Sequence, residues 1–164
     1  MGQALSTLGI RLFYAIGTST STDVKDAPKS GWKELPDPYK LPKTSAAAES
    51  HDASTLNNKK YKTFAQGLID VGGSLPFEFN MNDDTYTAWN TMLTEWEAVK
   101  DQNYPVWFYT VHPVFSKVGA FAGTPSIMGQ PESNTNDVWR VETSVTPTGE
   151  PGWVEKPSDL DAAE

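Results

Sequence analysis

The amino-acid sequence predicts a mainly β protein, an antiparallel β-sandwich or barrel with one flanking α-helix and a long polar arm loop. Roughly seven or eight segments have the two-residue apolar alternation or the turn-bounded apolar run of a strand. Only the stretch at about residues 83–100 repeats apolar residues at three- and four-residue steps, as an amphipathic helix does. Short strands beside one helix favour sheets that pack on each other or close into a barrel.

The overall composition indicates one domain that is stabilised by packing. The chain has 164 residues and no cysteine, so disulfides and thiolate metal sites are excluded. We assign residues 1–154 to the β domain, with a loop and arm at 24–60, and residues 155–164 to an acidic, flexible tail. The formal net charge of -8 disfavours a basic nucleic-acid-binding face. Arg11 interrupts the early apolar run, and we expect no secretory signal and no membrane-spanning segment.

The centre of the chain is a strand that runs directly into the helix. Apolar residues alternate over residues 75–81, which predicts a strand with one buried face. Asn82, Asp83 and Asp84 can cap the helix, because their side-chain oxygens can accept the free backbone N–H groups of its first turn. We expect the helix to cover a sheet with an apolar face made of Tyr86, Trp89, Met92, Leu93, Trp96 and Val99.

The N-terminal third predicts two strands joined by a loop. Residues 8–16 alternate with one fully apolar face, which is typical of a central or interfacial strand. Residues 18–30 are rich in Ser, Thr, Asp and Lys and predict a loop. Residues 32–35 predict a short strand.

A polar arm is expected between this region and the central strand. Prolines at 36, 38 and 42 break any regular ladder, and residues 41–60 are polar, rich in alanine and weakly periodic. We expect this arm to become ordered against a neighbouring chain; a surface loop without a partner is the alternative. Residues 61–66 return to a strand pattern, and Gly67 allows a turn.

The C-terminal part predicts three more strands. Residues 104–111 are apolar on both faces, so one face must meet the core and the other the helix or another subunit. Residues 117–123 form a strand of small residues that lets backbones approach closely, and residues 129–137 have turn chemistry. Residues 138–146 predict the last strand. From Pro147 the chain is rich in proline, glycine and acidic residues.

The sequence contains no recognisable catalytic, cofactor-binding or metal-binding motif. His51 and His112 are far apart and neither has a second histidine at ligand spacing. No nucleophile elbow, phosphate-binding glycine loop or dinucleotide fingerprint is present. Trp107, Trp139 and Trp153 could form a sugar-stacking platform, although aromatic residues in strands are more typical of a core or an interface. We therefore assign no catalytic, cofactor or metal residue and expect no enzymatic activity.

Taken in order, these segments resemble the major tail protein, or tail tube protein, of long non-contractile-tailed bacteriophages. The resemblance covers nearly the whole chain, and it rests on the order and spacing of strand and turn patterns. It is carried by Leu8–Ile16, Trp32–Pro36, Ser54–Leu56, Tyr61, Gly67–Asp70, Gly73–Asn80, Tyr86 and Pro147–Pro151.

The resemblance implies a structural virion protein without catalytic residues or a cofactor. Such subunits form hexameric rings whose inner sheets close into one barrel, and the rings stack into a tube through which DNA passes. The implied partners are further copies and the tape measure, tail tip and terminator proteins, and the implied location is the virion tail after assembly in the host cytoplasm. From the net charge of -8 we expect an acidic inner wall that does not hold DNA.

Two other functions remain open from the sequence. The first is the tube protein of a related contractile injection or secretion system, which would differ by having a sheath. The second is a carbohydrate-binding β-sandwich module that uses exposed tryptophans, which would bind oligosaccharides and would not form rings.

Overall fold

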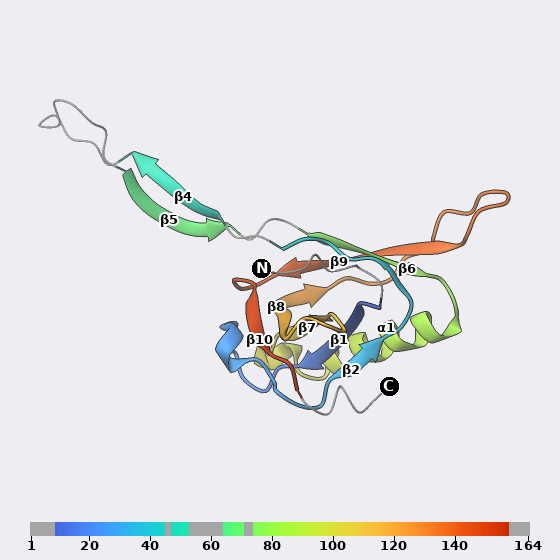
Figure 1. Ribbon diagram of the computed structural model, residues 1–164, viewed down its shortest axis with the longest axis horizontal. Coiled ribbons are helices and arrows are strands. Elements are labelled where there is room, and N and C mark those ends of the chain that lie inside the picture. The colour runs from blue at the N-terminus through green and yellow to red at the C-terminus, as the bar shows by residue number, and fades with distance from the viewer. Residues whose placement is uncertain (1–8, 45–46, 53–63, 71–73, 158–164) are drawn as a thin grey trace, which may run out of the picture.

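The protein is built on a curled antiparallel sheet that wraps around a helix, with a two-stranded hairpin extending from it (Figure 1). The computed structural model describes residues 9–44, 47–52, 64–70 and 74–157. Within these residues the sheet has eight strands: β1 (Arg11–Ile16), β2 (Lys33–Leu35), β3 (Pro38–Lys40), β6 (Leu75–Asn80), β7 (Val106–Val111), β8 (Lys117–Pro125), β9 (Arg140–Pro147) and β10 (Gly152–Glu155). The remaining elements are β4 (Ala47–Asp52), β5 (Phe64–Asp70), the helix α1 (Asp83–Glu97) and two 3-10 turns, η1 (Val24–Asp26) and η2 (Lys100–Gln102).

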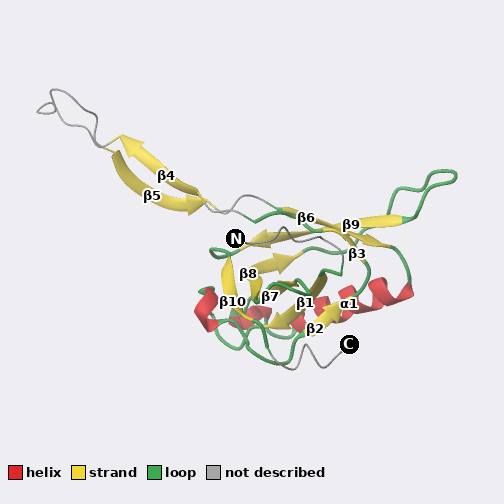
Figure 2. Cartoon of the chain, in the orientation of Figure 1, coloured by secondary structure: helices red, strands yellow, loops and turns green. Residues whose placement is uncertain are grey.

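The sheet curls because strand β8 has two different neighbours along one edge. The strand order is β2-β1-β7-β8-β9-β6-β3, with every pair antiparallel. On the edge away from β7, β8 pairs with β10 over residues 117–120 and with β9 over residues 123–125. The sheet therefore divides at β8, and β9, β6 and β3 turn over the layer made by β1 and β7 (Figure 2). The result is a half-barrel with a helix beside it, which confirms the predicted fold class.

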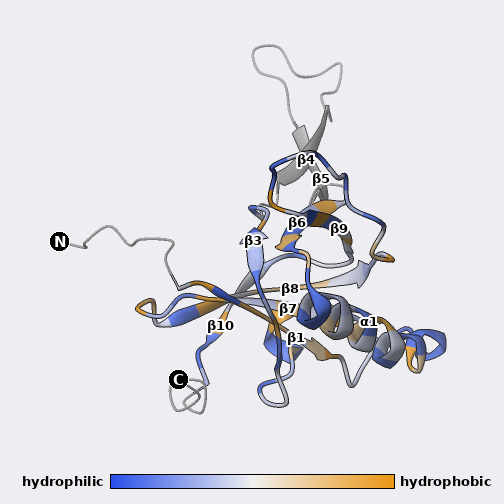
Figure 3. Ribbon diagram, turned by 90° about the vertical axis from the view of Figure 1, so that its right-hand side faces the viewer, coloured by the Kyte–Doolittle hydropathy of each residue, from blue (hydrophilic) through white to orange (hydrophobic). Residues whose placement is uncertain are grey.

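The concave face of the half-barrel and the helix enclose the larger core. The helix begins at the predicted position, where the Asn82 side chain accepts a hydrogen bond from the Thr85 backbone N–H at 2.9 Å. Helix α1 runs alongside β1 and β7 (Figure 3), and Trp89 and Met92 are almost completely buried. The buried members of this core are Leu12, Tyr14, Leu35, Phe77, Phe79, Trp89, Met92, Val106, Phe108, Phe121, Val141 and Val145.

The helical face differs from the prediction at two positions. Val99 lies beyond the last residue of α1, Glu97, and directly precedes η2. Tyr86 was expected to pack, but 54% of its surface is exposed. Thr85 takes the buried place at the start of the helix, where its hydroxyl donates to the Asn80 carbonyl at 2.9 Å. The apolar spacing of the helix is compatible with either residue 85 or residue 86 facing the sheet, because the buried face of a helix is wider than one row of side chains.

The second face of the β1-β7-β8 layer is also buried, and the segment between β1 and β2 covers it. Trp32 stacks on Tyr109 with ring centroids 3.8 Å apart. The Pro28 carbonyl accepts hydrogen bonds from the Trp32 indole at 2.8 Å and from the Tyr109 hydroxyl at 2.9 Å. Ala27 and Val24 complete this cover over Trp107, Val118 and their neighbours. The predicted dry partner of β7 is thus the segment between β1 and β2, rather than the helix or another subunit.

Two segments of the main sheet carry strands that the sequence did not predict. Pro38–Lys40 forms a short edge strand beside β6, although prolines were expected to prevent a ladder. Gly152–Glu155 pairs with β8, and the Glu155 carboxylate forms an ion pair with Lys117. Both strands are short and lie at edges, where proline and glycine interrupt few ladder bonds.

The arm is a β-hairpin where the structure describes it, which corrects the predicted loop. Strands β4 and β5 pair antiparallel, with Asp52 opposite Phe64 and Ala47 opposite Asp70. The register shifts between Ala48 and Ser50, so Gly67 lies in a bulge within β5 instead of in a turn. Residues 1–8, 45–46, 53–63, 71–73 and 158–164 lie outside the described residues, and so do the predictions that concern them.

Candidate functional site

The side chains singled out from the sequence do not come together into a chemical site. Among the described residues, no group of three or more His, Asp or Glu side chains could hold a metal ion. The His112 ring nitrogen Nδ1 accepts hydrogen bonds from the backbone N–H groups of Val114 at 3.0 Å and Phe115 at 3.3 Å, so this histidine shapes the β7–β8 turn. The side chain of His51 lies outside the described set. The search for membrane-spanning helices, made over the described part of the chain, found none.

The three tryptophans considered for a sugar platform occupy three different environments. Trp107 is buried under the segment between β1 and β2 and is 1% exposed. Trp153 lies beside the start of β8, opposite Gly119, whereas Trp139 follows the loop that leaves the other end of β8. The platform is therefore not assembled within one chain.

One surface of the half-barrel with several charged side chains is the outward face of β3, β6 and β9. The strand register aligns Lys40 with Glu78, and Glu78 with Glu142, in one row across the three strands. In the next row Asn80 lies opposite Arg140, whose guanidinium stacks over the Tyr39 ring at 3.7 Å. We call these six residues the outer row face: Tyr39, Lys40, Glu78, Asn80, Arg140 and Glu142.

The outer row face is not optimised for an isolated subunit. Glu78 and Glu142 are directly opposed across the strands, and like charges in that position are destabilising. The Asn80 Oδ1 and Arg140 Nε atoms are buried without a hydrogen-bond partner in the described structure. Buried polar atoms without a partner are rare in folded proteins, because each costs about 1–3 kcal/mol. The formal charges of the two carboxylates and the two cations on this face sum to zero.

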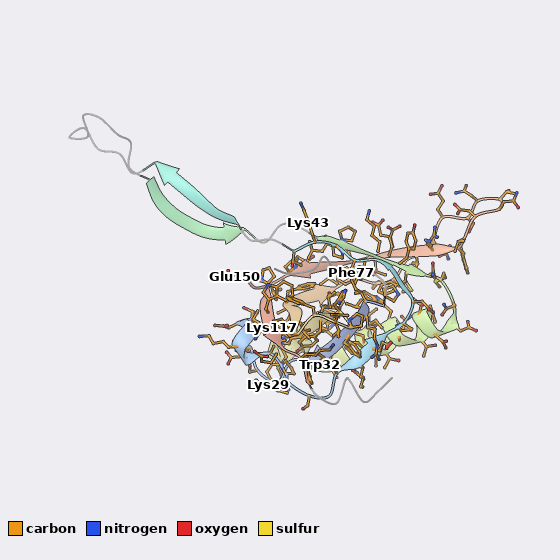
Figure 4. The ribbon with its side chains drawn as sticks, viewed as in Figure 1. Lys29, Trp32, Lys43, Phe77, Lys117 and Glu150 are labelled. Atoms are coloured by element: carbon orange, nitrogen blue, oxygen red, sulfur yellow. The ribbon has the colours of Figure 1, made fainter. Side chains whose placement is uncertain are left out.

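The second notable surface is a groove of about 650 Å³ at the open mouth of the half-barrel. Its floor includes Phe77 and Phe121, which belong to the core, and its rim includes Lys43, Lys117 and Glu150, all labelled in Figure 4 except Phe121. Trp153 forms one wall and is 66% exposed. Its ring contacts Phe115 edge to face, with centroids 5.4 Å apart. The groove therefore reaches down to the edge of the core, whose side chains Phe77 and Phe121 stay buried.

The third surface is the hairpin of β4 and β5, which extends away from the half-barrel (Figure 1). Its strands pair with each other and form a sheet separate from the main one. An isolated two-stranded hairpin is at best marginally stable in water, so a projecting hairpin is suited to docking on another surface.

From the sequence, Trp139, Trp153 and the arm at 41–60, which contains β4, were identified as candidates for contacts, but the outer row face and the groove as a whole were not. Alternation in residues 75–80 and 140–146 does place Glu78, Arg140 and Glu142 on polar strand faces. The missing information was that β6 and β9 pair with each other and in which register. That pairing joins residues 60 to 70 positions apart, and no local pattern encodes it.

Comparisons with known proteins identify the fold. No family model matches the sequence, and no curated protein matches it. Among solved structures, a chain of the anti-feeding prophage baseplate aligns with a TM-score of 0.57 and 10% identity, covering 94% of this chain and 98% of that chain. A chain of the native gene transfer agent virion aligns with a TM-score of 0.56 and 12% identity, covering 92% of this chain and 99% of that chain. A chain from the tail of the empty gene transfer agent particle aligns with a TM-score of 0.54 and 11% identity, with the same coverage of both chains. The chain thus has, over nearly its whole length, a fold found in tail and baseplate structures of phage-like particles.

Proposed function

We propose that this protein is a structural subunit of a phage-type tail tube, which assembles into hexameric rings that stack into a conduit for DNA. The observation that carries the proposal is the fold match over at least 92% of this chain and 98% of each particle chain. Two of those structures were determined as sixfold assemblies, one a baseplate and one a tail. A shared fold at such low identity leaves the role to be argued from the surfaces.

The shape of the sheet supports assembly from several copies. The half-barrel ends in the edge strands β2 and β3 and does not close on itself. Each of these edges is three residues long, and they include Lys33, Pro38 and Lys40, which protect a free subunit from uncontrolled strand pairing. If copies are arranged around an axis, sheets of neighbouring copies can lie side by side and together form a closed barrel, which a single half-barrel cannot do.

We propose that the outer row face lines the bore. It is the uncovered polar face of the sheet, whereas the outward face of β1, β7 and β8 is covered by Trp32 and Ala27. Its opposed carboxylates and its buried polar atoms without partners would gain neighbours or ordered water in a ring. The expected acidic wall stays a prediction, since Glu78 and Glu142 balance Lys40 and Arg140 on this face. A formally neutral, hydrated wall also offers phosphates little net attraction.

The hairpin of β4 and β5 is the proposed contact with a neighbouring subunit. Replacing residues 45–72 by a short Gly-Ser linker should leave the thermal unfolding transition of the half-barrel in place, because the core that the structure describes is built by the half-barrel, α1 and the segment between β1 and β2. The same deletion should abolish rings and tubes in electron micrographs of concentrated protein, in which the unmodified chain forms hollow sixfold particles. Loss of the folded state in the deletion would show instead that the arm belongs to the core.

A tube protein of a contractile injection system is the second candidate, and the same fold in a chain of the anti-feeding prophage baseplate is compatible with it. The two candidates differ in whether a sheath surrounds the tube. Electron microscopy of the native particle decides between them, because a sheath adds a second protein layer outside the ring of this subunit.

A further inference from the structure

We propose that the loop of residues 126–139 of one copy docks into the groove at the mouth of the half-barrel of the next copy. This inference rests on the proposed self-assembly and names the two surfaces that meet. We call the first surface the knob loop and the second the mouth groove.

The mouth groove is an apolar hollow above the core with an exposed tryptophan at its side. Trp153 pairs with Gly119, and therefore lies on the same concave face of β8 as Phe121. Phe121 is 6% exposed and packs within the core, yet Trp153 on the same face is 66% exposed. Helix α1 covers the core at Trp89 and Met92 but does not line the groove. An apolar concavity of about 650 Å³ with a tryptophan wall is the kind of pocket that accepts apolar side chains.

The knob loop presents apolar side chains at the opposite end of the same strand. Ile127 is 84% exposed, Val138 57% and Trp139 50%. Trp139 is held in place, because its indole donates to the Ser133 hydroxyl at 3.1 Å. The base of the loop is fixed by the Ser126 hydroxyl, which accepts from the Ser144 backbone N–H at 3.0 Å. Trp139 and the base of the loop are thus positioned before any partner binds, which lowers the entropic cost of docking.

The two surfaces lie towards opposite ends of one strand, which suits a head-to-tail contact. The mouth groove is lined by residues within Lys117–Phe121 of β8 and the knob loop follows the last residue of this strand, whose two ends lie roughly 26 Å apart over eight steps of about 3.3 Å. In a twofold dimer each knob loop would enter the groove of the other copy, which closes the assembly at two subunits. In the rings of the proposed function the contact is instead heterologous and repeats in one direction from copy to copy, and such a contact generates rings or filaments.

Charge and shape favour this pairing over contacts between like surfaces. The knob loop contains Glu132 and Asp137 and no lysine or arginine, so two knob loops would repel each other. The groove lining contains Lys43 and Lys117 against one acidic residue, Glu150, and Lys117 also pairs with Glu155. Two concave grooves cannot fill each other. A protruding acidic loop with an apolar base matches a concave apolar groove with a lysine at its rim.

The test uses one variant for each surface and a matched control. Val138→Asp alters the knob loop, Trp153→Asp alters the groove, and Tyr86→Asp alters an aromatic residue of the helix that is 54% exposed and outside both surfaces. Sedimentation velocity of concentrated protein measures association. Each surface variant alone should weaken the association constant about 30-fold or more, as expected for the loss of a central anchor. The control should associate like the unmodified chain.

Mixing the two surface variants gives the sharpest readout. Each pair retains one intact knob loop and one intact groove, so the mixture should form dimers and stop there. Association of both single variants at the control level would overturn the inference while leaving ring formation, and with it the proposed function, intact. Absence of rings from the unmodified chain and from the native particle would count against the proposed function itself.

A cross-linking experiment keeps the inference testable if the isolated chain does not assemble or a variant does not fold. The chain contains no cysteine, so Val114→Cys beside the groove and Val138→Cys on the knob loop introduce the only thiols. Mixed and oxidised, the two variants should give mainly the 114–138 heterodimer. Random proportions of homodimers and heterodimers would overturn the inference. That result is also expected if another tail protein or a segment of the same chain occupies the groove.

Discussion

Trp89 joins the helix to the half-barrel, and its removal gives the most direct test of the fold. The side chain is 1% exposed, contacts Phe79 and Phe108 with ring centroids 5.8 and 6.5 Å away, and donates its indole N–H to the Ser126 carbonyl at 2.9 Å. Trp89→Ala leaves a cavity in the core, and such changes cost about 3–5 kcal/mol. For a domain of this size, that loss lowers the melting temperature by roughly 6–20 °C.

Urea unfolding monitored by circular dichroism measures the effect, and Tyr86→Ala on the same helix is the control. Tyr86 is 54% exposed, so its truncation should change the free energy of unfolding by about 0.5 kcal/mol or less. Trp89→Phe keeps an aromatic ring but loses the hydrogen bond, and it should fall between the two. A cost below about 1 kcal/mol for Trp89→Ala, or equal costs at Trp89 and Tyr86, would refute the packing described here.

Two further predictions concern the sheet. Gly123→Ala should lower the free energy of unfolding by about 1–3 kcal/mol through overpacking, because its Cβ would lie 2.5 Å from Val145 Cγ1 and 3.0 Å from the Thr146 carbonyl oxygen. Gly119→Ala is the control and should destabilise the protein far less, because the atom nearest to its added Cβ is 3.6 Å away. Equal urea midpoints for the two variants would contradict this. Burial raises the pKa of Tyr109 above the usual 10.0, so the stability from its protonated form is complete below pH 10 and is lost as the pH rises further. Tyr109→Phe should therefore flatten the decline of unfolding free energy above pH 10, and an unchanged slope would argue against a buried hydroxyl.

The sequence predicted those elements whose signals are local. The strand at Leu75–Asn80, the cap at Asn82 and the helix that follows are each encoded within a few residues, and all three are present. The sequence also predicted that both faces of β7 are shielded from solvent, because apolar residues occupy successive positions of this strand and therefore both of its faces. Its cover by Trp32 was not recognised, because that contact depends on how a polar loop folds back over the sheet.

The elements that were not predicted depend on distant partners. Gly152–Glu155 is four residues long and flanked by proline and glycine, and it becomes a strand because β8 offers an edge at residues 117–120. The hairpin of β4 and β5 likewise depends on pairing across a long connection. The candidate surfaces follow the same rule. Trp107, Trp139 and Trp153 look alike in the sequence, and only the fold separates the buried one from the two exposed at opposite ends of β8.

The central claim is that copies of this chain complete one another around a hollow bore. A cryo-electron microscopy reconstruction of the assembled protein tests it most directly. We predict sixfold rings in which Glu78, Arg140 and Glu142 face the bore and the hairpin of β4 and β5 contacts a neighbouring subunit. A reconstruction in which the outer row face points to the outside, or in which the borders of the sheet never meet another copy, would contradict the account.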